Sequence, residues 1–207
     1  MRIRTWLVPV LVGLLASTGF AYPLKKPNRG FQKRVPRFTV QANEDWEGCI
    51  YGRLPNTKAI DAAEFQLLMP GDGHHFVLWK YEGDPPKGKR DWKLIPGCTG
   101  LAGPGTLIPN NLFGMQNANG RVRMPPGVAM RLEPHQQVLF NPHMKNFGAT
   151  PVRPDVRFNI IPAEKDTVEH LAESITVGNI GNIQIPAGGA QTLAFDWVVP
   201  GDMYIIQ

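Results

Sequence analysis

Short apolar runs alternate with turn-forming residues along most of this chain. Val, Ile, Phe, Trp and Leu gather in these runs, and the 20 prolines and 22 glycines are spread between them rather than clustered. Short apolar runs bounded by turn residues are typical of β-strands joined by turns. The pattern predicts strands at Phe38–Gln41, Trp46–Leu54, Ala63–Leu68, His74–Tyr81, Val128–Leu132, Val138–Asn141, Val156–Ile161, Ser174–Val177, Asn182–Ile185, Gln191–Val198 and Met203–Ile206.

The spacing of these strands predicts an all-β protein, built as a jelly-roll-like antiparallel β-sandwich or as a sandwich of the immunoglobulin type. One stretch, Ala163–Glu173, has the composition of a short helix. Two long segments, Glu82–Asp91 and Pro96–Gly127, are polar or rich in Gly, Pro and Asn, and we expect them to be loops. Long loops on a sandwich often carry function or are held by cross-links.

The first 21 residues have the features of a secretory signal. Arg2 and Arg4 precede an apolar stretch from Trp6 to Leu15, and Gly19-Phe20-Ala21 offers small residues for cleavage before Tyr22. The apolar stretch is too short for a stable membrane span, and no later segment is long and apolar enough for one. We therefore expect an exported protein, either periplasmic or secreted, whose mature chain starts at Tyr22.

The formal net charge of +5 is unevenly distributed along the chain. Residues 22–44 are basic, and this composition predicts a flexible leader, or an arm that contacts anionic lipid or polymer. The following residues, 45–207, are mildly acidic and are predicted to form one domain. They contain neither a basic helix nor an aromatic stacking platform, so we expect no nucleic-acid partner. The cations of the leader are Lys25, Lys26, Arg29, Lys33, Arg34 and Arg37.

Two cysteines, Cys49 and Cys98, are present. In an oxidising compartment an even pair indicates one disulfide, with two free thiols as the alternative. Cys98 lies in the second predicted loop, so a bridge to Cys49 would fix that loop to an early strand. In the loop-closure model such a bridge stabilises the fold by about 3–4 kcal/mol.

Three histidines form a candidate metal site. His74 and His75 are adjacent at the start of an apolar run, and His143 ends another such run. Imidazole ligands suit copper or zinc. Adjacent residues on a regular strand point to opposite faces, so His74 and His75 can share a metal only if the strand twists or bulges there. Gly71-Asp72-Gly73 allows this distortion. The alternative is a structural pair, with one histidine in the core and one in solvent.

His135 is an alternative third ligand, in the turn-like segment Glu133–Gln136. A metal-bound imidazole needs an acceptor for its other N–H group, and Asp72, Asn141 and Asn146 are candidates. The zinc-protease pattern His-Glu-x-x-His and the nucleophile pattern Gly-x-Ser-x-Gly are both missing from the sequence.

The order of these motifs resembles that of a known family. Trp46-Glu-Gly-Cys49 comes first, and the His74-His75 pair with its apolar run follows. Then come Cys98 in a Gly/Pro loop, Met124-Pro-Pro-Gly-Val-Ala-Met-Arg-Leu132, and the run that ends in His143 with Asn146 three residues on. From about Asp45 to Ile161 this order is similar to the N-terminal domain of the type II, ascorbate-dependent copper monooxygenases. Peptidylglycine α-hydroxylating monooxygenase, dopamine β-monooxygenase and looser bacterial relatives belong to that family.

The resemblance implies a jelly-roll-like sandwich that binds one copper through His74, His75 and His143. In the family this copper stores an electron supplied by ascorbate or another reductant and delivers it to a second copper. Dioxygen and substrate bind at the second copper, which a His-x-His pair and a methionine hold in a second domain. The pair Cys49 and Cys98 matches a family disulfide.

Two departures from the family pattern matter. Met144 stands where the family has a tyrosine, and it could be a soft contact of the copper or pack in the fold. The sequence contains no His-x-His pair. We therefore expect a one-copper domain, which hydroxylates C–H bonds of a small-molecule or peptide substrate only when a second copper domain or a partner chain completes it. The alternatives are a stand-alone periplasmic copper-binding or electron-transfer protein, and a non-catalytic exported binding module.

Overall fold

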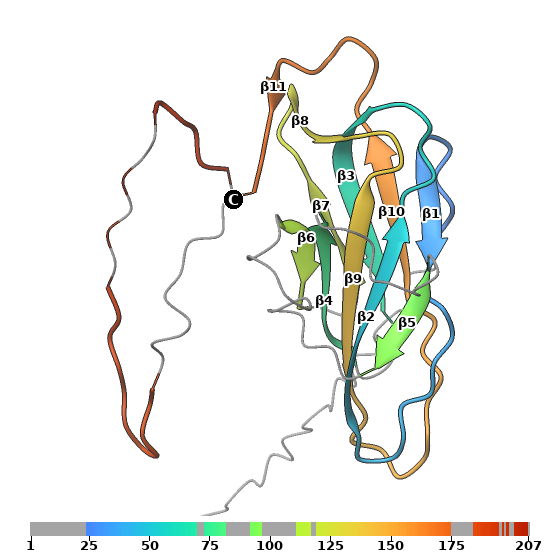
Figure 1. Cartoon of the computed structure of the whole chain (residues 1–207), viewed down its shortest axis with the longest axis vertical. Coiled ribbons are helices and arrows are strands. Elements are labelled where there is room, and N and C mark those ends of the chain that lie inside the picture. Colours follow the sequence, from blue (N-terminus) through green and yellow to red (C-terminus); the bar gives the residue numbers. More distant parts are fainter. Residues whose placement is uncertain are drawn as a thin grey trace, which may run out of the picture.

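The chain folds into two β-sheets packed face to face (Figure 1). A computed structural model describes residues 24–69, 73–81, 92–96, 111–116, 119–174, 184–194, 196, 198 and 201–206. These residues contain eleven strands and no helix. The predicted all-β sandwich is therefore confirmed.

The first sheet has the strand order β1-β10-β3-β8-β11, with β7 also paired to β3. All its pairs are antiparallel except β11 with β8. Because β8 and β7 pair with different halves of β3, they continue the same edge of that strand. The strands are β1 (Phe31–Arg34), β3 (Ile60–Leu68), β7 (Asn119–Arg123), β8 (Val128–Leu132), β10 (Arg157–Pro162) and β11 (His170–Leu171).

The second sheet has the order β5-β2-β9-β4-β6, and all its pairs are antiparallel. The central strand β9 lies between β2 and β4, and these three strands carry the residues that matter for function. The strands are β2 (Asp45–Arg53), β4 (Gly73–Lys80), β5 (Lys93–Pro96), β6 (Asn111–Met115) and β9 (Gln137–Lys145).

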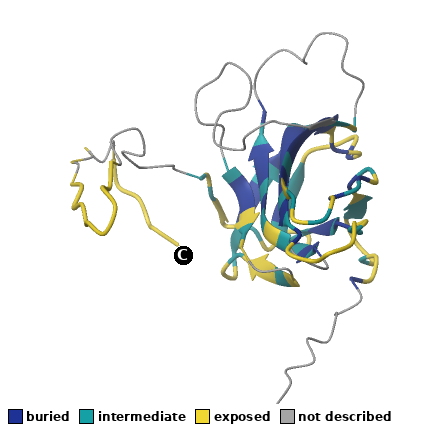
Figure 2. Ribbon diagram, turned by 90° about the horizontal axis from the view of Figure 1, so that it is seen from below, coloured by how far each residue is buried: buried dark blue, intermediate teal, exposed yellow. Residues whose placement is uncertain are grey.

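The hydrophobic core fills the space between the two sheets, where Figure 2 shows the buried residues. Phe140 on β9 and Phe158 on β10 belong to different sheets, and their ring centroids lie 4.6 Å apart. Phe76 on β4 packs against both rings. Burying each such side chain contributes about 1.5–3 kcal/mol. Because side chains alternate along a strand, this inward set leaves the intervening residues of β4 and β9 on the outer face.

The predicted flexible leader over residues 22–44 is wrong for the described residues 24–44. β1 lies in this segment and pairs with β10. Val35, Phe38 and Val40 are buried in the core, and the ring of Phe38 stacks on Trp46 at 3.9 Å. The apolar residues that separate the cations are therefore enough to fix this segment to the sandwich.

Several predictions for individual segments are wrong. Ala163–Glu173 contains turns and β11 instead of a helix, with Asp166 at a φ of 60°. β6 and β7 lie inside the predicted loop Pro96–Gly127. The described residues of 184–206 form no strand and run clear of the sandwich in Figure 1. They expose large apolar side chains, among them Tyr204 and Ile205.

Other predictions concern residues outside the described part of the chain. The signal sequence (residues 1–21) and the predicted loop Glu82–Asp91 lie there, and so do Asp72 and Cys98. Export and the Cys49–Cys98 disulfide thus remain predictions, although the thiol of Cys49 is not free. Within the described residues, no helix has the length and apolar character needed to cross a membrane.

Candidate metal centre

The fold brings His74, His75 and His143 into one cluster. The first two come from β4 and the third from the neighbouring strand β9. One ring nitrogen of each lies within 4.8 Å of the others. His75 and His143 are partly buried, whereas His74 is exposed. The predicted triad is therefore assembled in space on the outer face of the second sheet.

A β-bulge allows two adjacent histidines to join the same cluster. Gly73 pairs with Met144 and His75 pairs with His143, so His74 is an extra residue on β4. The bulge removes the strict alternation that would send one imidazole to each face. Gly73 is also closely packed, because a Cβ there would lie 2.6 Å from Cε of Met69 and the methionine would have to shift. The expected distortion before the histidine pair is confirmed.

The three imidazoles converge through their Nδ1 atoms. Nδ1 of His75 lies 3.2 Å from Nδ1 of His74 and 3.3 Å from Nδ1 of His143. The ring centroids of His74 and His143 are 4.8 Å apart. The other two centroid separations are 5.4 Å for His74 and His75 and 4.6 Å for His75 and His143, so the three rings form a triangle.

The opposite ring nitrogen of His143 is held by Asp45, the first residue of β2. Nε2 of His143 hydrogen-bonds Oδ1 of Asp45, while Nζ of Lys145 lies 3.2 Å from the other carboxylate oxygen. The hydrogen bond with His143, supported by Lys145, lowers the pKa of the Asp45 carboxyl group. An ionised carboxylate only accepts hydrogen bonds, so Nε2 of His143 carries the proton.

The opposite ring nitrogen of His75 faces the amide of Asn141, which is completely buried. Nδ2 of Asn141 donates to Oε1 of Glu47 at 2.9 Å and to the carbonyl oxygen of Gly48 at 3.1 Å. These acceptors fix the orientation of the amide, so its Oδ1 must point at Nε2 of His75, 3.3 Å away. Because an amide oxygen is an acceptor, Nε2 of His75 is the donor.

In their neutral forms, His75 and His143 would therefore share one tautomer, with the proton on Nε2 and a lone pair on Nδ1. Their Nδ1 atoms lie 3.3 Å apart, so a metal ion bound by both would lie between them. Burial lowers the pKa of His75, and the neighbouring imidazoles of His143 and His74 lower it further. The ring is therefore kept neutral, as a metal ligand must be.

The geometry fits a transition-metal ion. Imidazole nitrogens bind such a metal at about 2.0–2.1 Å, so two nitrogens on the same ion lie about 3–4 Å apart. Two Nδ1 separations, 3.2 and 3.3 Å, fall in this range, whereas the ligand atoms of the whole cluster span up to 4.8 Å, so the third ring would move closer on binding a metal. Three imidazoles with second nitrogens held by hydrogen bonds are a donor set suited to copper or zinc.

The structure does not bring the alternative third ligand into the cluster. His135 lies in the turn before β9, with a φ of 53°. It precedes His143 by eight residues, which at a strand rise of about 3.3 Å per residue is roughly 26 Å. His135 therefore lies at the opposite end of β9 from the cluster.

Two further predicted contacts of the site have other roles. Met144 is fully buried in the core, because it follows His143 on β9 and points to the opposite face. It packs in the fold and is not a soft contact of the site. The amide of Asn146 donates to the backbone carbonyls of Gln41 and Thr150, and its oxygen accepts from the N–H of Gly148. Asn146 therefore stabilises the loop after β9 rather than orienting an imidazole.

Sequence reasoning identified Asn141 but missed Asp45 and Glu47. Glu47 lies directly opposite His143 in the register of β2 and β9, and Asp45 lies opposite Lys145. Both acids alternate with Trp46 on β2, where the spacing of two residues places them on one face. The sequence therefore shows that the two acids share a face of β2. Only the register of β2 and β9 shows that this face lies beside the histidines.

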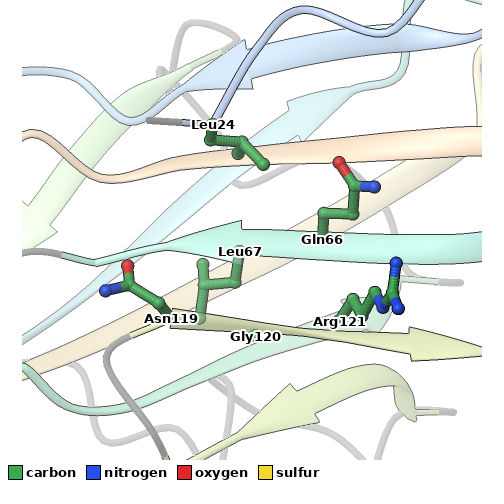
Figure 3. A pocket seen from close by; sticks show the side chains of 6 residues that line it. All are labelled: Leu24, Gln66, Leu67, Asn119, Gly120 and Arg121. Carbon is green, nitrogen blue, oxygen red and sulfur yellow. The ribbon is translucent and has the colours of Figure 1, made fainter. Parts of the chain in front are cut away.

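A pocket of about 450 Å³ lies on the first sheet, away from the strands that carry the histidines. Figure 3 shows Gln66 of β3 and Arg121 of β7 on neighbouring strands, where they are register partners. The Gln66 amide donates to Glu64 and accepts from Asn159. The polar atoms of the Gln66 side chain are therefore used in hydrogen bonds to other residues of the first sheet. The pocket is lined by Leu24, Gln66, Leu67, Asn119, Gly120 and Arg121.

In comparisons with known proteins, no family model matches this chain and no curated protein sequence matches it. The three-histidine cluster and the motif order along the chain are therefore the features that bear on function.

Proposed function

We propose that this chain is an exported copper-binding domain that stores and delivers an electron, similar to the N-terminal domain of ascorbate-dependent copper monooxygenases. One observation carries the proposal: the Nδ1 atoms of His75 and His143 lie 3.3 Å apart, with His74 completing the cluster. A bound copper ion would supply one-electron redox chemistry at this position.

Different residues of the site would bind the copper ion and orient its ligands. His74, His75 and His143 would hold the ion, and their neutral imidazoles suit both copper oxidation states. Asp45 and Asn141 hold the Nε2–H groups of His143 and His75, so that the rings need not reorient when a metal binds. The exposed edge of His74 leaves a route for an electron donor such as ascorbate.

Hydroxylation of a C–H bond with dioxygen would require a second copper site. No second His-containing cluster with the composition of a metal site occurs among the described residues. We therefore propose that a second copper domain or a partner chain completes the enzyme. The apolar side chains of residues 184–206 support this, since Tyr204 is 97% exposed and Ile205 is 80% exposed. Such a surface is typical of a segment that packs against another domain or chain.

A stand-alone copper-binding or electron-transfer protein is the second candidate. It is favoured by the fact that all three ligands come from two adjacent strands of one sheet, so the site needs no other domain to form. The two candidates share the copper site and differ only in the presence of a hydroxylating partner.

The experiment that tests the proposal is copper titration of the mature chain, from Tyr22 to Gln207. His143→Ala is the test variant, and His135→Ala is the matched control because His135 lies in a remote turn. We expect one tightly bound copper in the wild type and in the control, and none or a much weaker one in His143→Ala. Absence of copper binding, or binding indifferent to His143, would leave an exported β-sandwich without this function.

A further inference from the structure

We infer that β2, which contributes no ligand, carries the two residues that position the metal site: Asp45 orients His143, and Glu47 orients His75 through Asn141. This inference deepens the proposed copper site and rests on it. Neither acid belongs to the histidine motifs, and both reach the site because β2 is the direct neighbour of β9.

Asp45 contacts His143 through one carboxylate oxygen and Lys145 through the other. One of its carboxylate oxygens accepts from Nε2–H of His143, and Lys145 lies 3.2 Å from the other. The His143 side chain is only 15% exposed. A carboxylate that receives the N–H of a ligating histidine fixes the tautomer and the ring plane and makes the ligand a better donor.

Glu47 acts at a longer range, across the whole width of β9. It lies opposite His143 in the strand register, yet its Oε1 accepts from the Asn141 amide and stays 3.9 Å from Nε2 of His75. The carboxylate thus keeps the NH₂ group of Asn141 turned toward β2 and its oxygen turned toward β4. Together with the carbonyl oxygen of Gly48, Glu47 thus holds the amide in the orientation that makes Nε2 of His75 the donor.

His74 provides an internal comparison. Its interactions within the described structure are with the other two histidines, and no carboxylate or amide holds its second ring nitrogen there. If β2 positions the site, the metal-free protein should contain two histidines locked in the Nε2–H form and one, His74, free to exchange between tautomers.

The test uses the mature chain with three substitutions: Asp45→Ala, Asp45→Asn and Glu47→Ala. Glu164→Gln is the control for loss of a negative charge, because Glu164 is a surface residue paired with Arg29. Two quantities are measured on each protein. Imidazole ¹⁵N chemical shifts in the metal-free state report the tautomers, and competition with a chromophoric Cu(I) chelator gives the copper affinity.

We expect Asp45→Ala to release His143 into a mixture of tautomers and to weaken copper binding about 10–100-fold, the usual effect of removing such a partner. Asp45→Asn keeps an acceptor oxygen, so its loss should be smaller. Glu47→Ala removes one of the two acceptors of the Asn141 amide and should let that amide turn over, which changes the tautomer of His75 and leaves His143 unaffected. Glu164→Gln should match the wild type in both measurements.

Unchanged tautomers in Asp45→Ala and Glu47→Ala would overturn the inference, whatever happens to the affinity, because a loss of affinity alone is a charge effect. The tautomers are measured without metal, so they decide the inference even if the wild type binds no copper. In that case the proposed function fails separately. Thermal unfolding of each variant identifies any substitution that disrupts the fold, and Asp45→Asn then replaces Asp45→Ala.

Discussion

His75 and His143 are direct register partners on β4 and β9, and their Nδ1 atoms lie 3.3 Å apart. Directly opposite residues on antiparallel strands have their side chains in contact, so the sheet itself sets this distance. The hydrogen bonds that the Nε2–H groups donate to Asn141 and Asp45 then direct both Nδ1 atoms into the same space. A metal ion bound there would be shared by the two nitrogens.

Copper should stabilise the folded protein. At a free copper concentration about 100 times the dissociation constant, a ligand that binds only the native state adds about 2.7 kcal/mol. For a domain of this size, 1 kcal/mol moves the midpoint by about 2–4 °C, so we expect a rise of about 5–11 °C. Calorimetry with copper and with excess chelator measures it. His135→Ala should show the same rise, and His143→Ala should show almost none; an equal rise in both would place the copper elsewhere.

Replacing Gly73 should damage the bulge. A Cβ at this position would lie 2.6 Å from Cε of Met69, which is fully buried. Overpacking of this kind costs about 1–3 kcal/mol, and we expect Gly73→Ala to lose that much stability and to bind copper more weakly, because His74 follows directly. Urea unfolding and copper titration measure the two effects. Gly201→Ala is the control, since no atom lies within 4 Å of a Cβ there.

Met144 should affect stability but not copper. Its side chain lies in the core, on the face of β9 opposite His143. We expect Met144→Leu to cost less than about 1.5 kcal/mol and Met144→Ala to cost about 2–5 kcal/mol. Copper affinity and the electron paramagnetic resonance spectrum of the Cu(II) form should be those of the wild type in Met144→Leu. A changed spectrum would mean that the sulfur does reach the metal.

Glu64 should make stability depend on acid pH. Burial alone would raise the pKa of this carboxyl group, but hydrogen bonds from Gln66 and Arg123 outweigh it and lower the pKa below 4.5. A depressed pKa in the folded state means that the ion pair stabilises the protein above the ordinary pKa of glutamate. That contribution is lost as the pH falls through the folded-state value.

Glu64→Gln should therefore be less stable than the wild type at neutral pH, and the difference should shrink on acidification. Urea unfolding of both proteins between pH 7 and pH 3 measures this, with Glu164→Gln as an exposed control. A difference that is constant across the range would show that the charge of Glu64 contributes nothing.

The sequence predicted the sandwich and the three histidines because both depend on local patterns. The runs that became β2, β3, β4, β8, β9 and β10 are apolar enough to be recognised alone. β6 and β7 are not, because their Gly and Asn residues resemble a loop and their pairing with β4 and β3 stabilises them. The leader was misjudged because its charges are conspicuous, whereas the burial of Phe38 and Val40 depends on the partner sheet.

The surroundings of the histidines were less predictable. Asn141 is two residues from His143, so alternation alone places both on one face. The same rule places Met144 on the opposite face of β9. The sequence alone did not decide whether Met144 packs in the fold or contacts the copper. Asp45 and Glu47 are about a hundred positions from His143 along the chain, and no local pattern reveals which strand of a sheet will lie beside which. Their contribution could be recognised only from the register of β2 and β9.

The cluster stands on the outer face of its sheet, while the core between the sheets contains none of its imidazoles. Maturation can therefore proceed in two separate stages. The sandwich can fold first on its apolar residues, and the metal can enter, leave or be replaced afterwards without unfolding the chain. In this respect the protein is unlike a zinc finger, where metal and fold appear together. Which metal ion the protein binds, and how fully the site is loaded, would then depend on the metal ions available in its surroundings.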